Sequence, residues 1–341
     1  MRGALLLTLF LATATSDPLV DDVAKWNAYL ESVKNSTDEQ QKQMTDGMAP
    51  ILARAEAALK EGHRELALQR LATARLYLAA SEYVNSRPKA DRTDQASFEA
   101  EWKRAGALLR DDLKPTAPNA FAALQPAAIR AQAEATQPQV RIFYDASLDY
   151  SRNTDPFAGL FYVGSAIAQK QLAALCRQLS TPTSKAAPPV RAITSDIAAL
   201  QHDLLLAYKP PASIDRHGEF IGASSLLKEA RELDAGGLRY GALLRYLQAA
   251  LRVAPLRAPA AADAATVAKR LDEFEARLSD RSIDHTIGRQ FLDAARMDPA
   301  NAVAIATEVL PRYFAAIGPA PAAARKVTPV VTVTLVRWPF T

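Results

Sequence analysis

The residues with the clearest chemical potential are two histidines and two acids in one part of the chain. The stretch "SIDRHGEF" carries Asp215, His217 and Glu219, and His202 comes one expected helix earlier. Imidazole and carboxylate groups can together hold a metal ion or exchange a proton. Their spacing matches neither H-E-x-x-H nor the inward Glu-x-x-His pairs of di-iron bundles. An enzyme of unknown reaction that uses this polar cluster is therefore the alternative hypothesis.

Motifs that define a particular catalytic mechanism are absent from the sequence. It has no nucleophile elbow, no phosphate-binding glycine loop and no Cys-x-x-Cys pair. The single cysteine, Cys176, lies in the apolar stretch "QLAALCRQL", which favours a buried thiol over a nucleophile. We therefore expect no catalytic residue, no metal ligand and no cofactor.

Aromatic residues are concentrated between positions 143 and 162, where arginines also occur. Aromatic side chains at helical spacing usually fill the interior of a protein. Tyrosine and arginine are also favoured at the centres of binding interfaces. Tyr144, Tyr150, Arg152 and Tyr162 are therefore candidates for contacting a protein partner, although Tyr144 and Tyr150, six positions apart, would not share a helix face.

The C-terminal tail, 326–341, has the composition of a β-strand in a chain that otherwise has helical periodicity. It is rich in β-branched and aromatic residues and alternates in polarity. Val331, Val333, Leu335 and Trp338 are further candidates for partner contact.

Three alternatives remain open for this tail. It covers the protein's own helices or pairs with a short internal strand, or it adds as an edge strand to the sheet of another chain. In the third alternative it is a sorting signal, because it resembles the C-terminal strand of outer-membrane barrel proteins in its alternation and in Phe340. An uncovered strand of this composition would promote aggregation, so each alternative covers it.

The N-terminal stretch "MRGALLLTLFLATATS" has the pattern of a secretory signal peptide, which we place at 1–16. A basic residue precedes an apolar core, and small residues follow it. This pattern predicts export to the periplasm or the cell exterior. No later stretch is long and apolar enough to span a bilayer, so the mature chain is expected to have no transmembrane segment.

Composition narrows the class of partner. The chain has 341 residues, 49% of them hydrophobic, and 41 basic against 37 acidic residues for a net charge of +4. Basic and acidic residues alternate instead of forming a single-sign stripe, which argues against nucleic-acid binding. The length suffices for one large or two ordinary domains with hydrophobic cores.

Helical periodicity and capping signals predict an all-α protein. Asp-Pro pairs at Asp17, Asp155 and Asp298 each place a capping carboxylate before a proline at the first helical position. The expected helices cover 18–35, 38–61, 63–86, 94–112, 119–136, 138–152, 156–180, 189–208, 214–234, 237–253, 263–280, 283–296 and 299–317. The proline-rich stretch after position 180 suggests two helical domains, 17–180 and 188–320. We predict an irregular bundle or solenoid of antiparallel helix pairs with a short C-terminal strand.

One segment resembles a known repeat family. "LLKEARELDAGGLRYGALLRYLQAALRVAP" (226–255) reads as helix, glycine turn, helix and proline stop, and "ALKEGHRELALQRLATARLYL" (58–78) echoes it. The longer segment resembles a tetratricopeptide-repeat hairpin in Tyr240, Tyr246, Ala250, Leu251 and Pro255, and the echo shares Gly62, Ala67 and Ala74. The resemblance implies a protein-binding scaffold.

Together these observations favour an exported, non-enzymatic binding or scaffolding protein of the bacterial cell envelope. The alternatives are the enzyme described above and a self-associating structural subunit of the cell surface.

Overall fold

The computed structural model describes residues 17–211, 213–257 and 263–318, and this part of the chain is all-α. No β-strand forms within these residues; a single isolated bridge joins Ala186 and Ile283. The predicted all-α class is therefore confirmed. The expected signal peptide and the expected C-terminal strand both lie outside the described residues.

Most helices fall where the periodicity placed them. The α-helices are α1 (Pro18–Val33), α2 (Glu39–Lys60), α3 (Arg64–Asn85), α4 (Gln95–Leu109), α5 (Ala127–Asn153), α6 (Pro156–Leu179), α7 (Thr194–Ala207), α8 (His217–Ala235), α9 (Arg239–Val253), α10 (Ala264–Leu278), α11 (Thr286–Met297), α12 (Pro299–Ala304) and α13 (Leu310–Ala316). Within these helices none is long and apolar enough to cross a bilayer.

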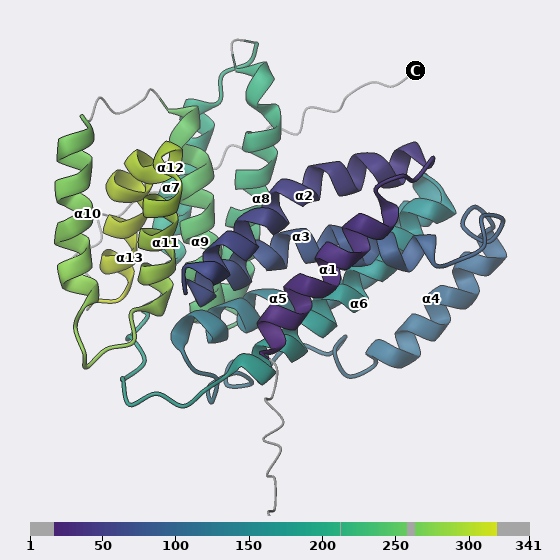
Figure 1. Ribbon diagram of the computed structural model, residues 1–341, viewed down its shortest axis with the longest axis horizontal. Helices are drawn as coiled ribbons and strands as arrows, with labels where there is room; N and C mark the ends of the chain where they lie inside the picture. The colour runs from purple at the N-terminus through teal and green to yellow at the C-terminus, as the bar shows by residue number, and fades with distance from the viewer. Residues whose placement is uncertain (1–16, 212, 258–262, 319–341) are drawn as a thin grey trace, which may run out of the picture.

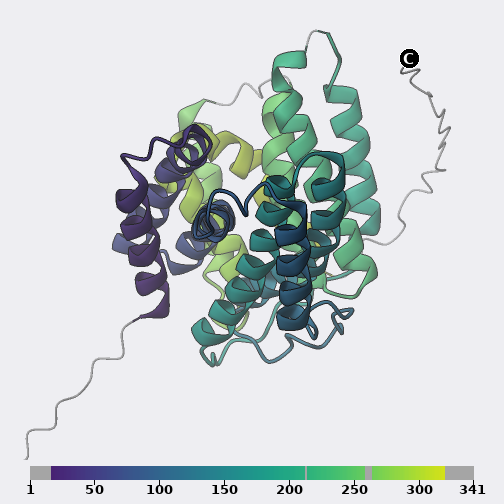
Figure 2. The ribbon, with the colours of Figure 1, turned by 90° about the vertical axis from the view of Figure 1, so that its right-hand side faces the viewer.

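Consecutive helices pair, and the pairs pack around a central one. The most extensive contacts are within α5–α6, α8–α9 and α2–α3, while α3 packs on α6 and α9 packs on α5. The α5–α6 pair therefore separates and supports the other two. In Figure 1 the helices α10 to α13 gather at one end of the molecule and α4 lies at the other. Figure 2 shows α1 on the side away from the upright α7 and α8.

The Asp-Pro helix starts act as the sequence predicts. Asp155 accepts a hydrogen bond from the backbone N–H of Ala158 at 2.7 Å, directly before α6. Asp17 and Asp298 accept equivalent bonds at the starts of α1 and α12. Each carboxylate satisfies an N–H group that has no partner inside the helix.

The expected break at Pro138 is wrong. Two helices, 119–136 and 138–152, were expected, but α5 runs unbroken through Pro138 and begins only at Ala127. Proline inside a helix costs about 3 kcal/mol. Side chains on both sides of Pro138, from Ala127 to Ser151, are buried against α6 and α9, and this packing outweighs the local cost. The last expected helix, 299–317, contains a π-helical turn at Ile305–Val309.

A buried carboxylate joins the central pair to the C-terminal helices. Glu134 of α5 is fully buried, and its Oε2 accepts the N–H of Gly241 in the first turn of α9 at 2.9 Å. Its Oε1 accepts from Arg130 at 2.7 Å, and the Arg130 guanidinium lies 4.1 Å from the centre of the Tyr240 ring. Burial raises the pKa of Glu134. The carboxylate thus caps a helix that lies more than a hundred positions away in sequence.

Two more helices begin on side chains that are distant in sequence. Asp284 accepts the N–H of Ala127 at 2.6 Å, and Thr286 accepts the N–H of Ala128 at 3.0 Å, so the start of α11 and the loop before it cap α5. Asp234 of α8 likewise accepts from the N–H of Ile193 at 3.2 Å, at the start of α7. The starts of α5 and α7, which have no local side-chain cap, are therefore completed by tertiary contacts.

Glu134→Ala should lower the free energy of unfolding by about 3 kcal/mol, because it leaves Arg130 and the start of α9 without their partner. Urea unfolding followed by circular dichroism measures the loss. Glu134→Gln, which keeps an acceptor for Gly241, should lose less. An Ala variant as stable as the wild type would contradict the capping role.

Gly241→Ala should lower the unfolding free energy by about 1–3 kcal/mol, because a Cβ there would lie 2.8 Å from the backbone nitrogen of Ala135. Gly218→Ala is the matched control, since a Cβ at this helical position has no atom within 4 Å. The control should be neutral or slightly stabilising. Equal unfolding midpoints for the two variants would rule out close approach of α9 to α5.

Candidate functional site

The four residues of the polar cluster at 202–219 are exposed and do not form an enclosed site. His202, Asp215, His217 and Glu219 are all exposed. His217 Nδ1 lies 2.8 Å from the hydroxyl of Tyr208, so its partner is a tyrosine and not one of the acids. Among the described residues, no group of three or more His, Cys, Asp or Glu side chains is placed to hold a metal ion.

The aromatic candidates separate into a core residue and a surface pair. Tyr144 is buried, and its hydroxyl donates to the backbone carbonyl of Trp102 at 3.1 Å. Its ring stacks on the Trp102 ring, with the ring centres 5.1 Å apart. Tyr150 and Tyr162 stack on each other with ring centres 4.0 Å apart, and Tyr150 is 42% exposed. Arg152 is exposed. The tail candidates Val331, Val333, Leu335 and Trp338 lie outside the described residues.

A cavity lies between the α2–α3 and α8–α9 hairpins, and we call it the inter-hairpin groove. Its volume is about 620 Å³, within the range of ligand-binding clefts. Its floor is formed by α5 and α6, through Gln132, Gln139, Phe143, Gln169 and Leu172, and α11 and α12 contribute at one end. The two hairpins form the walls. The first contributes Ile51, Arg54, Arg70, Thr73, Leu76 and Tyr77, among others, and the second contributes Leu226, Glu229, Arg245, Gln248, Leu251 and Arg252.

The two hairpins turn in the same way. Gly62 and Gly237 both adopt positive φ, at 83° and 77°. In the first turn the N–H of His63 bonds to the carbonyl of Ala58, and in the second the N–H of Leu238 bonds to that of Leu233. These are the glycine caps in which a left-handed residue closes the end of a helix. The two turns thus fix the same register for the helices that follow.

With the two turns aligned, the groove is lined by equivalent positions of both hairpins. The offset between the turn glycines is 175 residues, from 62 to 237, and the same offset relates six pairs of lining positions. The pairs are 51 and 226, 54 and 229, 70 and 245, 73 and 248, 76 and 251, and 77 and 252. The repeat-like segments noted in the sequence therefore face each other across one cavity.

A chain of hydrogen bonds crosses the floor. Gln169 donates to Gln139 at 2.8 Å, and Gln139 donates to Glu229 at 2.7 Å. Glu229 also pairs with Arg245 at 2.9 Å, and Arg245 donates to Gln248. Gln169 Oε1, at the other end of this chain, is buried and has no hydrogen-bond partner among the described residues. A buried acceptor without a donor lowers the stability of the folded state.

The first hairpin has an arginine where the second has the acid of an ion pair. Arg245 pairs with Glu229, whereas the equivalent residues of the first hairpin, Arg70 and Arg54, are both positively charged. Arg70 is half-buried and donates to the backbone carbonyl of Arg54 at 2.9 Å. Its pKa is lowered, first by burial and then by the charge of Arg54. None of the ion pairs among the described residues includes Arg54 or Arg70, and the charges of Asp298 and Glu61 only partly offset the lowering of the pKa of Arg70.

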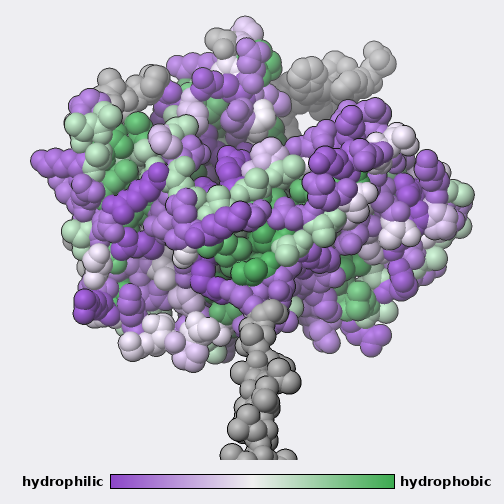
Figure 3. Space-filling model, in the orientation of Figure 1, coloured by the Kyte–Doolittle hydropathy of each residue, from purple (hydrophilic) through white to green (hydrophobic). Residues whose placement is uncertain are grey.

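Aromatic rings extend the apolar wall of the groove. Tyr77 is 42% exposed and lies 6.3 Å from Phe161, and Phe143 lies 5.9 Å from Tyr162. The candidate pair Tyr150 and Tyr162 is therefore continuous with the groove through Phe143. Figure 3 shows one face of the molecule, where hydrophilic side chains dominate and apolar ones form a band across the middle.

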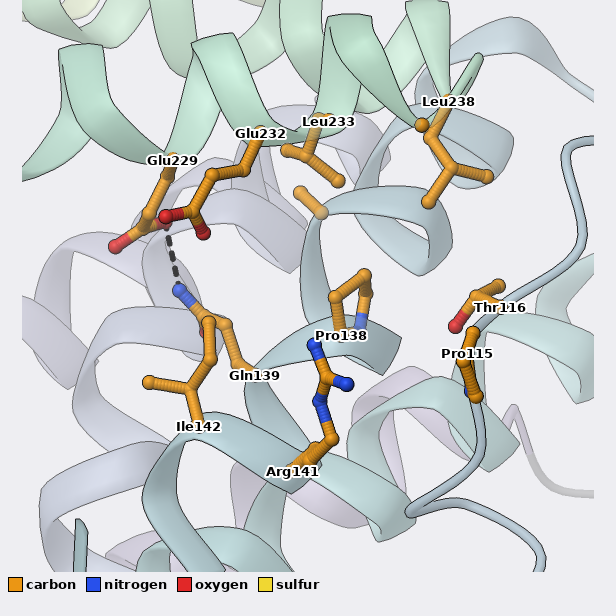
Figure 4. A pocket seen from close by; sticks show the side chains of 12 residues that line it. Pro115, Thr116, Pro138, Gln139, Arg141, Ile142, Glu229, Glu232, Leu233 and Leu238 are labelled. Carbon is orange, nitrogen blue, oxygen red and sulfur yellow. Dashed lines mark hydrogen bonds between the residues drawn. The ribbon is translucent and has the colours of Figure 1, made fainter. Parts of the chain in front are cut away.

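A smaller apolar pocket lies beside the groove. Its volume is about 180 Å³, and it is lined by Pro115, Pro138, Ile142 and Leu233 among others. Figure 4 shows the Gln139–Glu229 hydrogen bond at its edge, with Pro138 beneath Leu233 and Leu238. Gln139 and Glu229 line both cavities, so this bond separates the pocket from the groove.

Buried acids lie behind one wall of the groove. Glu65 is half-buried at the start of α3, and its burial raises its pKa. Asp293 of α11 is buried as well, pairs with His63 at 3.1 Å and also has a pKa raised by burial. Leu66 and Ala294, the neighbours of these acids in sequence, line the groove.

A scan against protein-family models, a search of curated proteins and a search of solved structures each found no match. The groove is therefore interpreted from its own geometry. The sequence reasoning missed the glutamines and arginines that line it. Aligning the two hairpin segments at Gly62 and Gly237 would have paired Arg70 with Arg245, and this is the signal that could have found them.

Glu65→Gln should raise the free energy of unfolding at pH 7, because the folded state must desolvate a charge that the amide does not carry. A folded pKa above the unfolded value means that the contribution of Glu65 is fully present below the unfolded pKa and is lost as the pH rises through the folded one. The gain from Gln should therefore disappear below about pH 4. Urea unfolding from pH 3.5 to 7.5 measures it, and an equal gain at every pH would contradict the assignment.

Proposed function

We propose that the protein is an exported, non-enzymatic binding component of the bacterial cell envelope, and that it holds a segment of a partner polypeptide in the inter-hairpin groove. The observation that carries the proposal is a cavity of about 620 Å³ that is lined by six pairs of equivalent positions from two hairpins. The leader-like N-terminus supports export to the periplasm or the cell exterior.

The chemistry of the groove supports binding over catalysis. Glu229 is held by Arg245 and Gln139, and Asp298 accepts from Ala300 and Asn301. Both carboxylates are thus engaged in structural contacts and poorly placed to act as a general base. Apolar and aromatic walls with a few placed polar groups are typical of recognition sites.

The hairpin resemblance and the tail belong to the same proposal. Tetratricopeptide-like hairpins imply protein binding, and mixed surface charge argues against a nucleic-acid partner. The strand-like tail, with Val331, Val333, Leu335 and Trp338, is proposed as a second contact that pairs with a partner or with the chain itself.

Thr73→Trp should remove partners that need the groove, because Thr73 lines it and an indole would fill it. Affinity purification from envelope extracts, compared by mass spectrometry, measures this. Lys103→Trp on the exposed face of α4 is the matched control and should retain every partner. A partner set unchanged by Thr73→Trp would contradict the proposal.

A chain lacking 319–341 separates the contribution of the tail in the same experiment. Partners that are lost only when 319–341 is removed bind the C-terminal tail, and partners that are lost only in Thr73→Trp bind the groove.

A further inference from the structure

The comparison of the two hairpins identifies two arginines that form none of the ion pairs among the described residues. At equivalent positions, the second hairpin has the ion pair Arg245–Glu229 and the first has Arg70 beside Arg54. Arg70 is half-buried, and the groups that it contacts are the carbonyl of Arg54 and, at 3.7 Å, the sulfur of Met297. Desolvating a guanidinium without a counter-ion is unfavourable, so an anion supplied from outside would be stabilised here.

We infer that Arg54 and Arg70 form the carboxylate-binding subsite of the groove, and that the segment it takes is an acidic peptide. In this arrangement a Glu or Asp side chain of the segment occupies the position that Glu229 holds beside Arg245. The inference rests on the proposed function and specifies the chemistry of its ligand.

Two neighbouring features favour a peptide over a small acid. Tyr77 lies two helical turns beyond Arg70 on α3, about 10 Å away along the axis, so a ligand that reaches both must be extended. Leu76 and Leu251 provide apolar contacts between these points.

Arginines without an ion pair make the groove complementary to an acidic ligand. Glu229 pairs with Arg245, but none of the ion pairs among the described residues includes Arg54, Arg70 or Arg252, which all line the groove. Arg54 and Arg70 are also joined by a hydrogen bond, so their guanidinium groups belong to one site. Charge complementarity therefore favours a segment that carries an acidic side chain.

The test uses the full-length protein and two pools of hexapeptides. One pool is randomised over Leu, Tyr, Phe, Ser and Glu, and the matched pool has Gln in place of Glu. Peptides retained on the immobilised protein are identified by mass spectrometry. We expect Glu to be enriched about tenfold in the bound fraction, because a charge-assisted hydrogen bond to a partly desolvated guanidinium is worth roughly one decade of affinity.

Arg70→Gln and Arg54→Gln should each abolish this enrichment, and Arg110→Gln, which removes the same charge from the exposed end of α4, should preserve it. Arg54 is exposed, so its variant keeps the test valid even where Arg70→Gln disturbs folding. Loss of enrichment in Arg110→Gln would show a non-specific charge effect and overturn the inference.

The outcomes also separate this inference from the proposed function. Equal retention of the Glu and Gln pools, or retention of neither, overturns the acidic-peptide assignment, while the groove proposal is decided by the Thr73→Trp comparison with native partners. Dodecanoate that displaces the Glu pool and binds more tightly than any recovered peptide would assign the subsite to a small acid and overturn the peptide assignment.

Discussion

The contact between α5 and α9 is the constraint on which the rest of the structure depends. A charged carboxylate, Glu134, is taken out of water and placed against the N-terminus of α9, where the aligned peptide dipoles and the N–H of Gly241 stabilise it. The same crossing requires glycine at 241, because a side chain there would meet the backbone of α5. It fixes the α8–α9 hairpin on the central pair, and thereby the width of the groove.

The two hairpins that line the groove have the same turn geometry but different charged residues. The two hairpins share their turn geometry and their register, and six positions that face the cavity in one hairpin have a counterpart that faces it in the other. A single difference, arginine at 54 where the other hairpin has glutamate at 229, changes a closed ion pair into two guanidinium groups that lack an acid. Packing is conserved between the hairpins because it depends on shape, while the polar positions are free to differ because they face the cavity.

Local signals located most of the secondary structure, and the errors have tertiary causes. Asp155 caps α6 as expected because an N-cap acts within three residues. Pro138 did not end α5, because contacts with α6 and α9 outweigh the local cost of proline. Of the candidate binding residues, Tyr144 was placed in the core by its stacking on Trp102, a partner 42 positions away that periodicity alone could not identify. The tail residues lie outside the described part of the chain.

The sequence by itself determined the all-α class, the positions of most helices and the likeness of the two hairpin segments, because these depend on residues a few positions apart. Only the tertiary structure decided that the two hairpins face one cavity, that Gln169 is buried without a donor, and that Glu134, Asp284 and Asp234 cap helices distant in sequence. The physical reason is that burial and pairing depend on which surfaces meet in space. The sequence around Ala127 and the sequence around Asp284 do not indicate that these two residues are in contact.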